Sequence, residues 1–251
     1  MPRGLTLHRR DAIAIVSIER PERRNALSLD VLHGLAEVFG SLVSHSTRAV
    51  VLQGSAGCFS AGADLGELEG TLSDLRVDDA VAAVGASVRA TPIPVIAAIE
   101  GPCVGAAVEI AMACDLRVVS ETAYFQLPAV HLGLLYRPGA VADLAKQIAP
   151  PVLARLLLFA DRLSADESVA LGVAAGPVTP ASGASERALA LAGQLPEPPA
   201  DALGATKRLL VELARGGDPS AFEAVRRELL ASPGRAAALA AARRRIAGRR
   251  S

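Results

Sequence analysis

Residues 101–115 read GPCVGAAVEIAMACD, and Glu109 is the only charged residue between Glu100 and Asp115. The residues around Glu109 are small or apolar, which is typical of a helix that is buried on all sides. An unpaired carboxylate in such a helix would cost several kcal/mol of stability or would stay protonated. The stretch therefore predicts a buried helix that holds a carboxyl group in a pocket.

The pattern also predicts where this helix begins. We expect it to open at Gly105 and Ala106, which places the free N–H groups of its first turn at the same end as Glu109. Ala106 and Glu109 are three residues apart and so lie on one face of the helix. A backbone N–H beside a buried carboxyl group suits a carbonyl that becomes an oxyanion, with an acid or base next to it. The alternative is a structural ion pair, for instance with Arg89 or Arg117.

The composition excludes several broad functions. The 251 residues allow one large domain, or a domain with an appendage. Lys+Arg and Asp+Glu balance at 26 each, which argues against a nucleic-acid or membrane-surface role. No apolar run reaches the length of a membrane span, and the first residues are not typical of a secretory signal. Cys58, Cys103 and Cys114 match neither a metal spacing nor a disulfide framework, so we expect a reducing, cytoplasmic location.

Strand-like and helical patterns alternate along the first two thirds of the chain. Apolar β-type runs stand at 12–18, 49–53, 95–99 and 116–119, and helical patterns at 28–43, 74–90 and 105–113. This alternation predicts an α/β fold with mostly parallel strands. Ser28 is expected to cap a helix, and Ser164 with Glu167 forms a capping-box pattern. From about residue 186 the pattern is helical throughout, with breaks at 196–199, 216–219 and 232–234.

A second informative stretch, GCFSAGADL at 57–65, directly follows the expected strand at 49–53. Small residues at 61–63 allow a ligand to approach the backbone, and Asp64 can cap a short helix after it. The stretch is not a serine-hydrolase elbow, because Cys58 occupies a position that must be glycine. Without further information, an ordinary strand–turn–helix connection explains the pattern equally well.

Three stretches, taken together in order and spacing, resemble the crotonase superfamily (enoyl-CoA hydratase/isomerase). They are Arg20-Pro21 with Asn25-Ala-Leu27, FSAGADL at 59–65, and GPCVGAAVEIAMACD at 101–115. The likeness continues through Leu132-Gly133 and 164–172, so it covers most of the chain. The resemblance implies a crotonase-type spiral of ββα units over 1–185 that binds acyl-CoA. It also implies a C-terminal helical region over 186–251 that forms homotrimers or homohexamers.

The resemblance also implies which residues form the site. In this family two backbone N–H groups polarise the thioester carbonyl of an acyl-CoA and hold the resulting enolate; by position these belong to Ala63 and Ala106. The second position is usually glycine, but an alanine at a helix start donates the same N–H. Coenzyme A arrives as part of the substrate, and no metal or redox cofactor is implied. The residues implied to bind the acyl-CoA are Arg24, Ala26, Ala61, Ala63, Asp64, Leu65, Gly66, Gly105 and Ala106.

One departure from the family pattern affects the expected reaction. Hydratases of the family use two glutamates; the first corresponds to Glu109, but Ala129 stands at the position of the second. Loss of one general acid or base removes a factor of roughly 10²–10⁴ in rate unless another group replaces it. Hydration by the usual scheme with two carboxylates is therefore in doubt.

The segment Leu132-Gly-Leu-Leu-Tyr136 resembles methylmalonyl-CoA decarboxylase, a member of the family that also lacks the second glutamate. That enzyme has a tyrosine at the same separation from its glutamate, and a phenol of pKa about 10 can donate a proton to an enolate. The alternative is that Tyr136 has a structural role and packs in the core or at a subunit interface. His131 and Arg137 could meet a substrate carboxylate, although we expect both on the surface. Three functions stay open: a hydratase-like lyase, a decarboxylase of malonyl-type thioesters, and a non-catalytic acyl-CoA binder.

Overall fold

A computed structural model of the chain describes residues 3–42, 47–195 and 200–248. The chain forms two compact units, Met1–Gln194 and Leu195–Ser251. No helix in the described ranges combines the length and apolar character that a membrane span requires.

The first unit is built around a six-stranded sheet. The strands follow the order β1 (Leu5–Arg10), β2 (Ile13–Ile18), β3 (Ala49–Gly54), β4 (Val95–Ile99), β6 (Leu116–Ser120) and β9 (Ala175–Thr179). Only β1 runs antiparallel to its neighbour; the pairs from β2 to β9 are parallel. The predicted α/β fold with mostly parallel strands is confirmed, and each of the four predicted strands is present.

A second, smaller sheet is formed by three strands that are too short to show a hydrophobic pattern in the sequence. It contains β5 (Pro102–Val104), β7 (Tyr124–Gln126) and β8 (Leu163–Ser164). The parallel pairing of β5 with β7 and the antiparallel pairing of β7 with β8 hold the segment just before residue 105 in place. A bridge between Ser60 and Cys103 then fastens the 57–65 stretch to β5.

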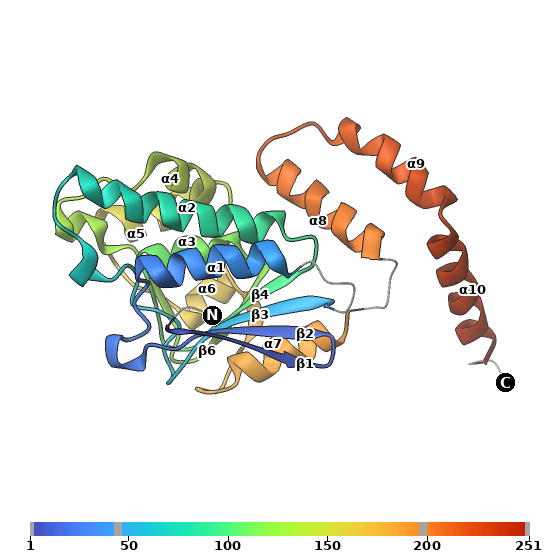
Figure 1. Ribbon diagram of the computed structural model, residues 1–251, viewed down its shortest axis with the longest axis horizontal. Helices are drawn as coiled ribbons and strands as arrows, with labels where there is room; N and C mark the ends of the chain where they lie inside the picture. Colours follow the sequence, from blue (N-terminus) through green and yellow to red (C-terminus); the bar gives the residue numbers. More distant parts are fainter. Residues whose placement is uncertain (1–2, 43–46, 196–199, 249–251) are drawn as a thin grey trace. The chain divides into compact units, whose positions relative to one another are not determined.

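Helices cover both sides of the large sheet, with α1 (Leu29–Ser41) and α2 (Leu75–Ala90) on one side and α7 (Ala184–Gly193) on the other (Figure 1). The remaining helices of this unit are α3 (Ala106–Ala113), α4 (Pro138–Ala145), α5 (Pro150–Leu158) and α6 (Ala165–Ala170). The predicted caps are confirmed: the Ser28 side chain accepts a hydrogen bond from Val31 N, and Ser164 with Glu167 forms a capping box.

The core lies between the sheet and the pair α1 and α2. Leu32, Leu35 and Phe39 of α1 are at most 1% exposed, and every residue of β4 is buried. Each fully buried side chain of this size contributes about 1.5–3 kcal/mol to stability. Because the strands are apolar on both faces, the sheet requires helices on each side, which α7 supplies opposite α1 and α2.

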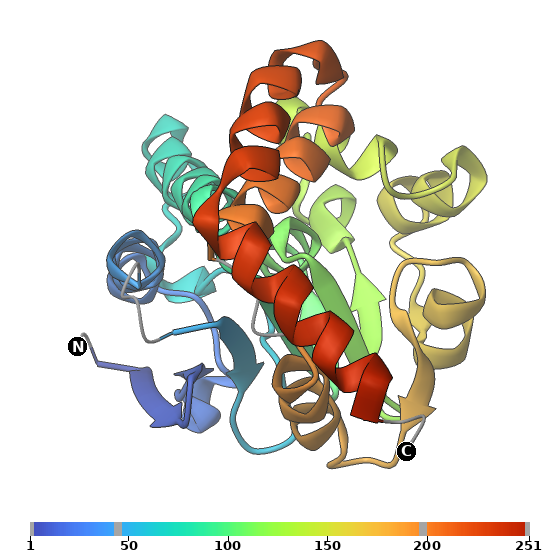
Figure 2. The ribbon, with the colours of Figure 1, turned by 90° about the vertical axis from the view of Figure 1, so that its right-hand side faces the viewer.

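The second unit contains α8 (Ala200–Ala214), α9 (Glu223–Ala231) and α10 (Pro233–Gly248), visible as successive helices in Figure 2. The predicted break at 216–219 falls between α8 and α9, the break at 232–234 falls on Ser232 between α9 and α10 and on the first two residues of α10, and 196–199 lies outside the described residues. The predicted boundary at residue 185 falls inside α7, whereas the first unit extends to Gln194. The reason is that Ala184, Ala188 and Ala192 are buried at one-turn spacing, which lets α7 pack closely on the sheet.

Candidate active site

Helix α3 begins at Ala106 and carries Glu109 in its first turn, as the sequence predicts. Gly105 precedes the helix with φ 57° and ψ −122°, a backbone conformation that residues with a Cβ atom rarely adopt. Ala107, Val108 and Ile110 are buried, and the Glu109 side chain is only 14% exposed. The predicted buried helix with an isolated carboxyl group is therefore present.

The 57–65 stretch lies against the start of α3 because Gly62 permits a close backbone approach. Gly62 has φ +93°, and a Cβ atom built on it would lie 2.6 Å from Val104 O and 3.7 Å from Ala106 N. Any larger residue would push the two segments apart. Gly62 thus brings the backbone of Ala63 toward the N-terminus of α3.

The backbone N–H groups of Ala63 and Ala106 are available to a ligand. Within the described residues neither group donates a hydrogen bond, although the neighbouring Asp64 N–H bonds to Leu27 O at 3.0 Å. Ala106 is the first residue of its helix, so its N–H has no partner within the helix. Two unused donors near a buried carboxyl group are the elements that stabilise a developing oxyanion.

The geometry of the 24–27 segment depends on Asn25, which is fully buried. Its Nδ2 donates to Ser55 O at 2.9 Å and to Cys58 O at 2.6 Å, and its Oδ1 accepts from Arg20 N at 2.9 Å. Next to it, Arg24 O accepts a hydrogen bond from Ala61 N at 3.0 Å. The side chain of Arg24 is exposed, and Ala26 is buried. The structure therefore brings Arg24, Ala26 and Ala61 together.

Asp64 fixes the turn rather than pointing freely toward solvent. Its Oδ2 accepts from Arg20 Nη2 at 2.9 Å, and its Oδ1 accepts from Gly66 N at 3.1 Å. Burial alone would raise the pKa of Asp64, but the hydrogen bonds from Arg20 and Gly66 outweigh it and lower the pKa. Asp64 thus caps the short 3-10 helix Leu65–Glu67, as predicted, while Leu65 and Gly66 are exposed at the edge of the turn.

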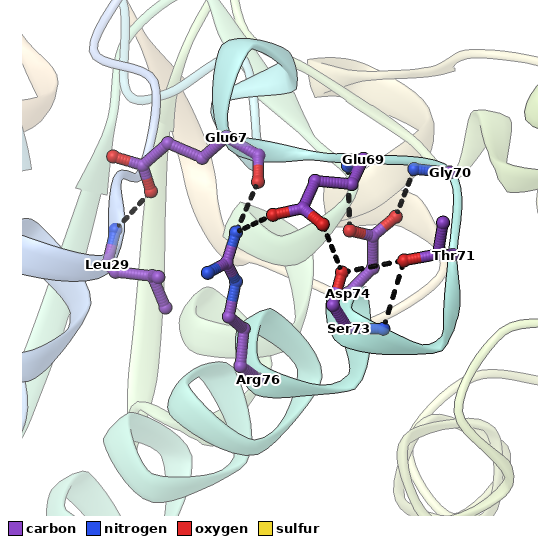
Figure 3. Close-up of polar contacts among 8 residues, drawn as sticks. All are labelled: Leu29, Glu67, Glu69, Gly70, Thr71, Ser73, Asp74 and Arg76. Carbon is purple, nitrogen blue, oxygen red and sulfur yellow. Dashed lines mark hydrogen bonds and ion pairs between the residues drawn. The ribbon is translucent and has the colours of Figure 1, made fainter.

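A polar network anchors the segment that follows this turn (Figure 3). Glu67 Oε2 accepts from Leu29 N, the first N–H of α1, at 2.7 Å. Arg76 Nη2 donates to Glu67 O at 3.1 Å and to Glu69 Oε1 at 3.0 Å. Asp74 accepts from the N–H groups of Glu69 and the next residue at 2.8 and 2.9 Å. The segment that follows the turn at 63–66 is therefore tied to the first residues of α1 and of α2.

The partner of Glu109 is Arg137, whose Nη2 donates to Glu109 Oε2 at 3.0 Å. The sequence offers Arg89 and Arg117 as examples of an ion-pair partner; the ion pair is present but is formed by Arg137, and the charge of Arg89 also lowers the pKa of Glu109. Arg117 instead donates to the carbonyl oxygens of Val173 and Cys114, and Arg89 Nη2 lies 3.6 Å from Asp143 Oδ2.

The predicted surface position of Arg137 is wrong, because its side chain is only 29% exposed and turns toward α3. Arg137 directly precedes α4, which begins at Pro138. His131 is exposed, as expected.

Glu109 has the electrostatic environment of an acid/base group. Burial raises its pKa, while the hydrogen bond and the charge of Arg137 oppose the rise, and the negative charge of Asp78 on α2 adds to it. The net result is a raised pKa, which brings the carboxyl group closer to the pH at which it can both give and accept a proton. The sequence contains no local signal for the approach of Asp78 or Arg137, since each comes from another element.

A small pocket of about 20 Å³, room for a water molecule, lies beside Glu109. Its walls come from α2, α3, α4 and residues on either side of α4, and include Arg89, Met112, Arg137 and Leu144. The pocket combines apolar side chains with charged groups at the carboxylate, but at this size it holds no more than a water molecule.

Tyr136 is half-buried and packs against the core cluster. Burial raises its pKa well above the ordinary value, and the negative charge of Glu109 adds to the rise. The phenol therefore stays protonated at neutral pH and can donate, but not accept, a proton. Ala129, at the position of the absent second glutamate, lies half-buried in the 3-10 helix Pro128–Leu132.

Comparison with known proteins identifies the class that this fold and site define. The family described as enoyl-CoA hydratase/isomerase matches residues 8–238. The 2,3-dehydroadipyl-CoA hydratase of Escherichia coli is 31% identical over 212 residues, which cover 82% of this chain and 81% of that protein. The chain belongs to the enoyl-CoA hydratase/isomerase family, and hence to the crotonase superfamily.

Two further relatives agree with this membership. The crystal structure of an enoyl-CoA hydratase/carnithine racemase from Magnetospirillum magneticum superposes with a TM-score of 0.88 at 29% identity, covering 96% of this chain and 93% of that one. The "Probable enoyl-CoA hydratase echA6" of Mycobacterium bovis is 34% identical over 164 residues, which are 65% of this chain and 66% of that protein. The chain thus spans about two thirds of the length of this mycobacterial relative.

Proposed function

We propose that the chain is a hydratase-like lyase that acts on an acyl-CoA thioester through an enolate held in an oxyanion hole. The observation that carries this proposal is the pair of unused backbone N–H groups at Ala63 and Ala106, next to the buried carboxyl group of Glu109. Membership of the enoyl-CoA hydratase/isomerase family supports an acyl-CoA as substrate.

In hydration, Glu109 takes a proton from a water molecule while the water oxygen forms a bond to the β-carbon of the enoyl group. The electron pair of the double bond moves to the thioester oxygen, where the N–H groups of Ala63 and Ala106 stabilise the negative charge. The enolate then takes a proton at the α-carbon, and the carbonyl re-forms. Only one carboxyl group serves both proton transfers, because Ala129 cannot titrate.

A second candidate, decarboxylation of a malonyl-type thioester, is favoured by the position of Tyr136. The bond between the α-carbon and the carboxylate breaks, CO₂ leaves, and the electron pair forms the same enolate. Tyr136, which stays protonated, then donates its proton to the α-carbon and recovers one from water. A third candidate is a non-catalytic acyl-CoA binder, and the retention of Glu109 favours an enzyme over it.

Further parts of the proposal concern binding and assembly. Arg24 and Ala26 would contact the nucleotide end of CoA, and residues 61–66 with Gly105 would line the thioester. CoA enters as part of the substrate, and the proposed chemistry needs no metal ion. Homotrimers or homohexamers with the helices of 186–251 at the contacts, and a cytoplasmic location, complete the proposal.

The test is mass spectrometry of the purified protein with crotonyl-CoA, 3-hydroxybutyryl-CoA, malonyl-CoA and methylmalonyl-CoA in deuterated water. The proposal predicts a gain of water or a loss of CO₂ with deuterium at the α-carbon of the product, or a loss of water from 3-hydroxybutyryl-CoA, which removes a proton from that carbon. Glu121→Gln is the matched control for the variant Glu109→Gln, since Glu121 is an exposed carboxylate outside the site. Failure of every thioester to react would leave only the binder.

A further inference from the structure

Arg137 has more hydrogen-bonding capacity than the protein uses. A guanidinium group offers five N–H donors, and the Arg137 side chain makes one hydrogen bond in the described part of the chain, to Glu109. Its Nε is buried there without a hydrogen-bond partner. The planar donor edge of an arginine matches a carboxylate, which it binds through two parallel hydrogen bonds.

Charged groups of both signs surround the pocket. Asp143 is shared by two cations, since Arg89 Nη2 and Lys146 Nζ each lie 3.6 Å from one of its oxygens. With Arg137 this gives three cations, balanced by the carboxylates of Glu109, Asp143 and Asp78, so the unused donors of Arg137, and not an excess of positive charge, are what a further anion would bind. Asp78, an exposed residue of α2, is close enough to Arg137 for their charges to interact and is the only other carboxylate that acts on Glu109 among the described residues.

The pocket as it stands is too small for an acyl chain, and Arg137 forms part of its wall, so a chain that enters beside Glu109 would displace wall side chains such as Arg137. A hydrocarbon tail that displaced Arg137 would leave two charges without their partner in a half-buried site, which is costly. A carboxylate on the tail would instead take the place of the Glu109 oxygen on Arg137. Such an exchange keeps the arginine paired, and only Glu109, which then becomes available for proton transfer, loses its partner.

We propose that the acyl group of the substrate carries a second carboxylate, which Arg137 binds in the pocket between α2, α3 and α4. The proposal rests on the acyl-CoA function proposed above and specifies its substrate class. The carboxylate can stand on the α-carbon, as in malonyl-type thioesters, or at the far end of the chain, as in thioesters of longer dicarboxylic acids.

The experiment is isothermal titration calorimetry with saturated thioesters in pairs of equal chain length. Propionyl-CoA against malonyl-CoA tests a carboxylate on the α-carbon, and hexanoyl-CoA against adipyl-CoA tests a distal one; recovered ligands are checked by mass spectrometry. The carboxylated member of at least one pair should bind the wild type about tenfold more tightly or better, the factor for one charge-assisted hydrogen bond.

Variants of the pocket separate this role from a structural one. Arg137→Gln should bring the ratio of affinities for the carboxylated and the uncarboxylated thioester close to one, and Arg137→Lys should leave an intermediate ratio. Asp78→Asn should raise this ratio above that of the wild type. Arg155→Gln is the matched control, because Arg155 pairs with Asp161 and Glu167 away from the pocket. Circular dichroism and thermal unfolding verify that each variant is folded.

Two results would overturn the inference. Equal affinities within both pairs, or a preference that persists in Arg137→Gln, would exclude Arg137 as a carboxylate receptor while leaving the acyl-CoA function intact. Failure of all four thioesters to bind the wild type would refute the acyl-CoA function and the inference together.

Discussion

Arg137 Nη2 and Glu109 Oε2 lie 3.0 Å apart and join the residue that precedes α4 to the first turn of α3. The contact pairs the carboxyl group proposed for proton transfer with a cation that opposes the effect of burial on its pKa. The availability of Glu109 for proton transfer thus depends on the position of Arg137, and this dependence can be tested.

The substitution Glu109→Gln keeps the shape of the side chain and its capacity to accept a hydrogen bond, but it removes titration. Turnover should fall by at least the roughly 10²–10⁴ that a general acid or base supplies. Affinity for a saturated acyl-CoA, measured by calorimetry, should change little. Normal turnover in this variant would make Glu109 a structural residue.

The substitution Arg137→Gln should shift the pH dependence of hydration. In the wild type Arg137 holds down a pKa that burial raises, so its removal raises the pKa of Glu109 further. A step that needs ionised Glu109 is lost as the pH falls through this pKa, so the acidic limb of kcat/KM for crotonyl-CoA should move to higher pH. The Arg155→Gln control should keep the wild-type profile, and a shift of the Arg137 variant to lower pH would contradict the electrostatic account.

The substitution Ala129→Glu should increase hydration of crotonyl-CoA, because a second carboxyl group could position the attacking water beside Glu109. The gain is bounded by about 10²–10⁴ and should be smaller, since the surrounding side chains are not arranged to support the new group. Fast hydration by the wild type itself would show that Tyr136 or an ordered water already replaces the missing acid.

The substitution Tyr136→Phe distinguishes decarboxylation from hydration. If Tyr136 protonates the enolate, the variant should release CO₂ but lose stereochemical control of deuterium incorporation in deuterated water, with binding almost unchanged. If Tyr136 only packs against the core, loss of the hydroxyl should cost on the order of 1 kcal/mol of stability and leave the stereochemistry intact.

The parts of the structure that the sequence predicted are those with strong local signals. The strands at 49–53 and 95–99 are apolar on both faces, and the start of α3 at Ala106 is marked by Gly105. Strands β5, β7 and β8 have only two or three residues each, too few for a periodic pattern, and were not predicted. The sequence pattern places most of the alanine-rich α7 in the C-terminal region, because the sheet on which it packs is distant in sequence.

The site was predicted less completely than the fold. The buried position of Glu109 followed from its apolar neighbours, but its partner did not, because Arg137 reaches it from the loop before another helix. The same applies to Asp78, which acts on Glu109 from α2. A single isolated charge indicates that a partner is needed; it does not indicate which of several arginines provides it.

The central claim is that Ala63 and Ala106 form the oxyanion hole, and a crystal structure with a bound, non-reactive acyl-CoA tests it most directly. The account predicts that the thioester oxygen lies about 2.7–3.1 Å from both backbone nitrogens, with Glu109 beside the α- and β-carbons. A thioester oxygen bonded elsewhere would contradict it, and so would N–H groups of Ala63 and Ala106 that do not point toward the same atom.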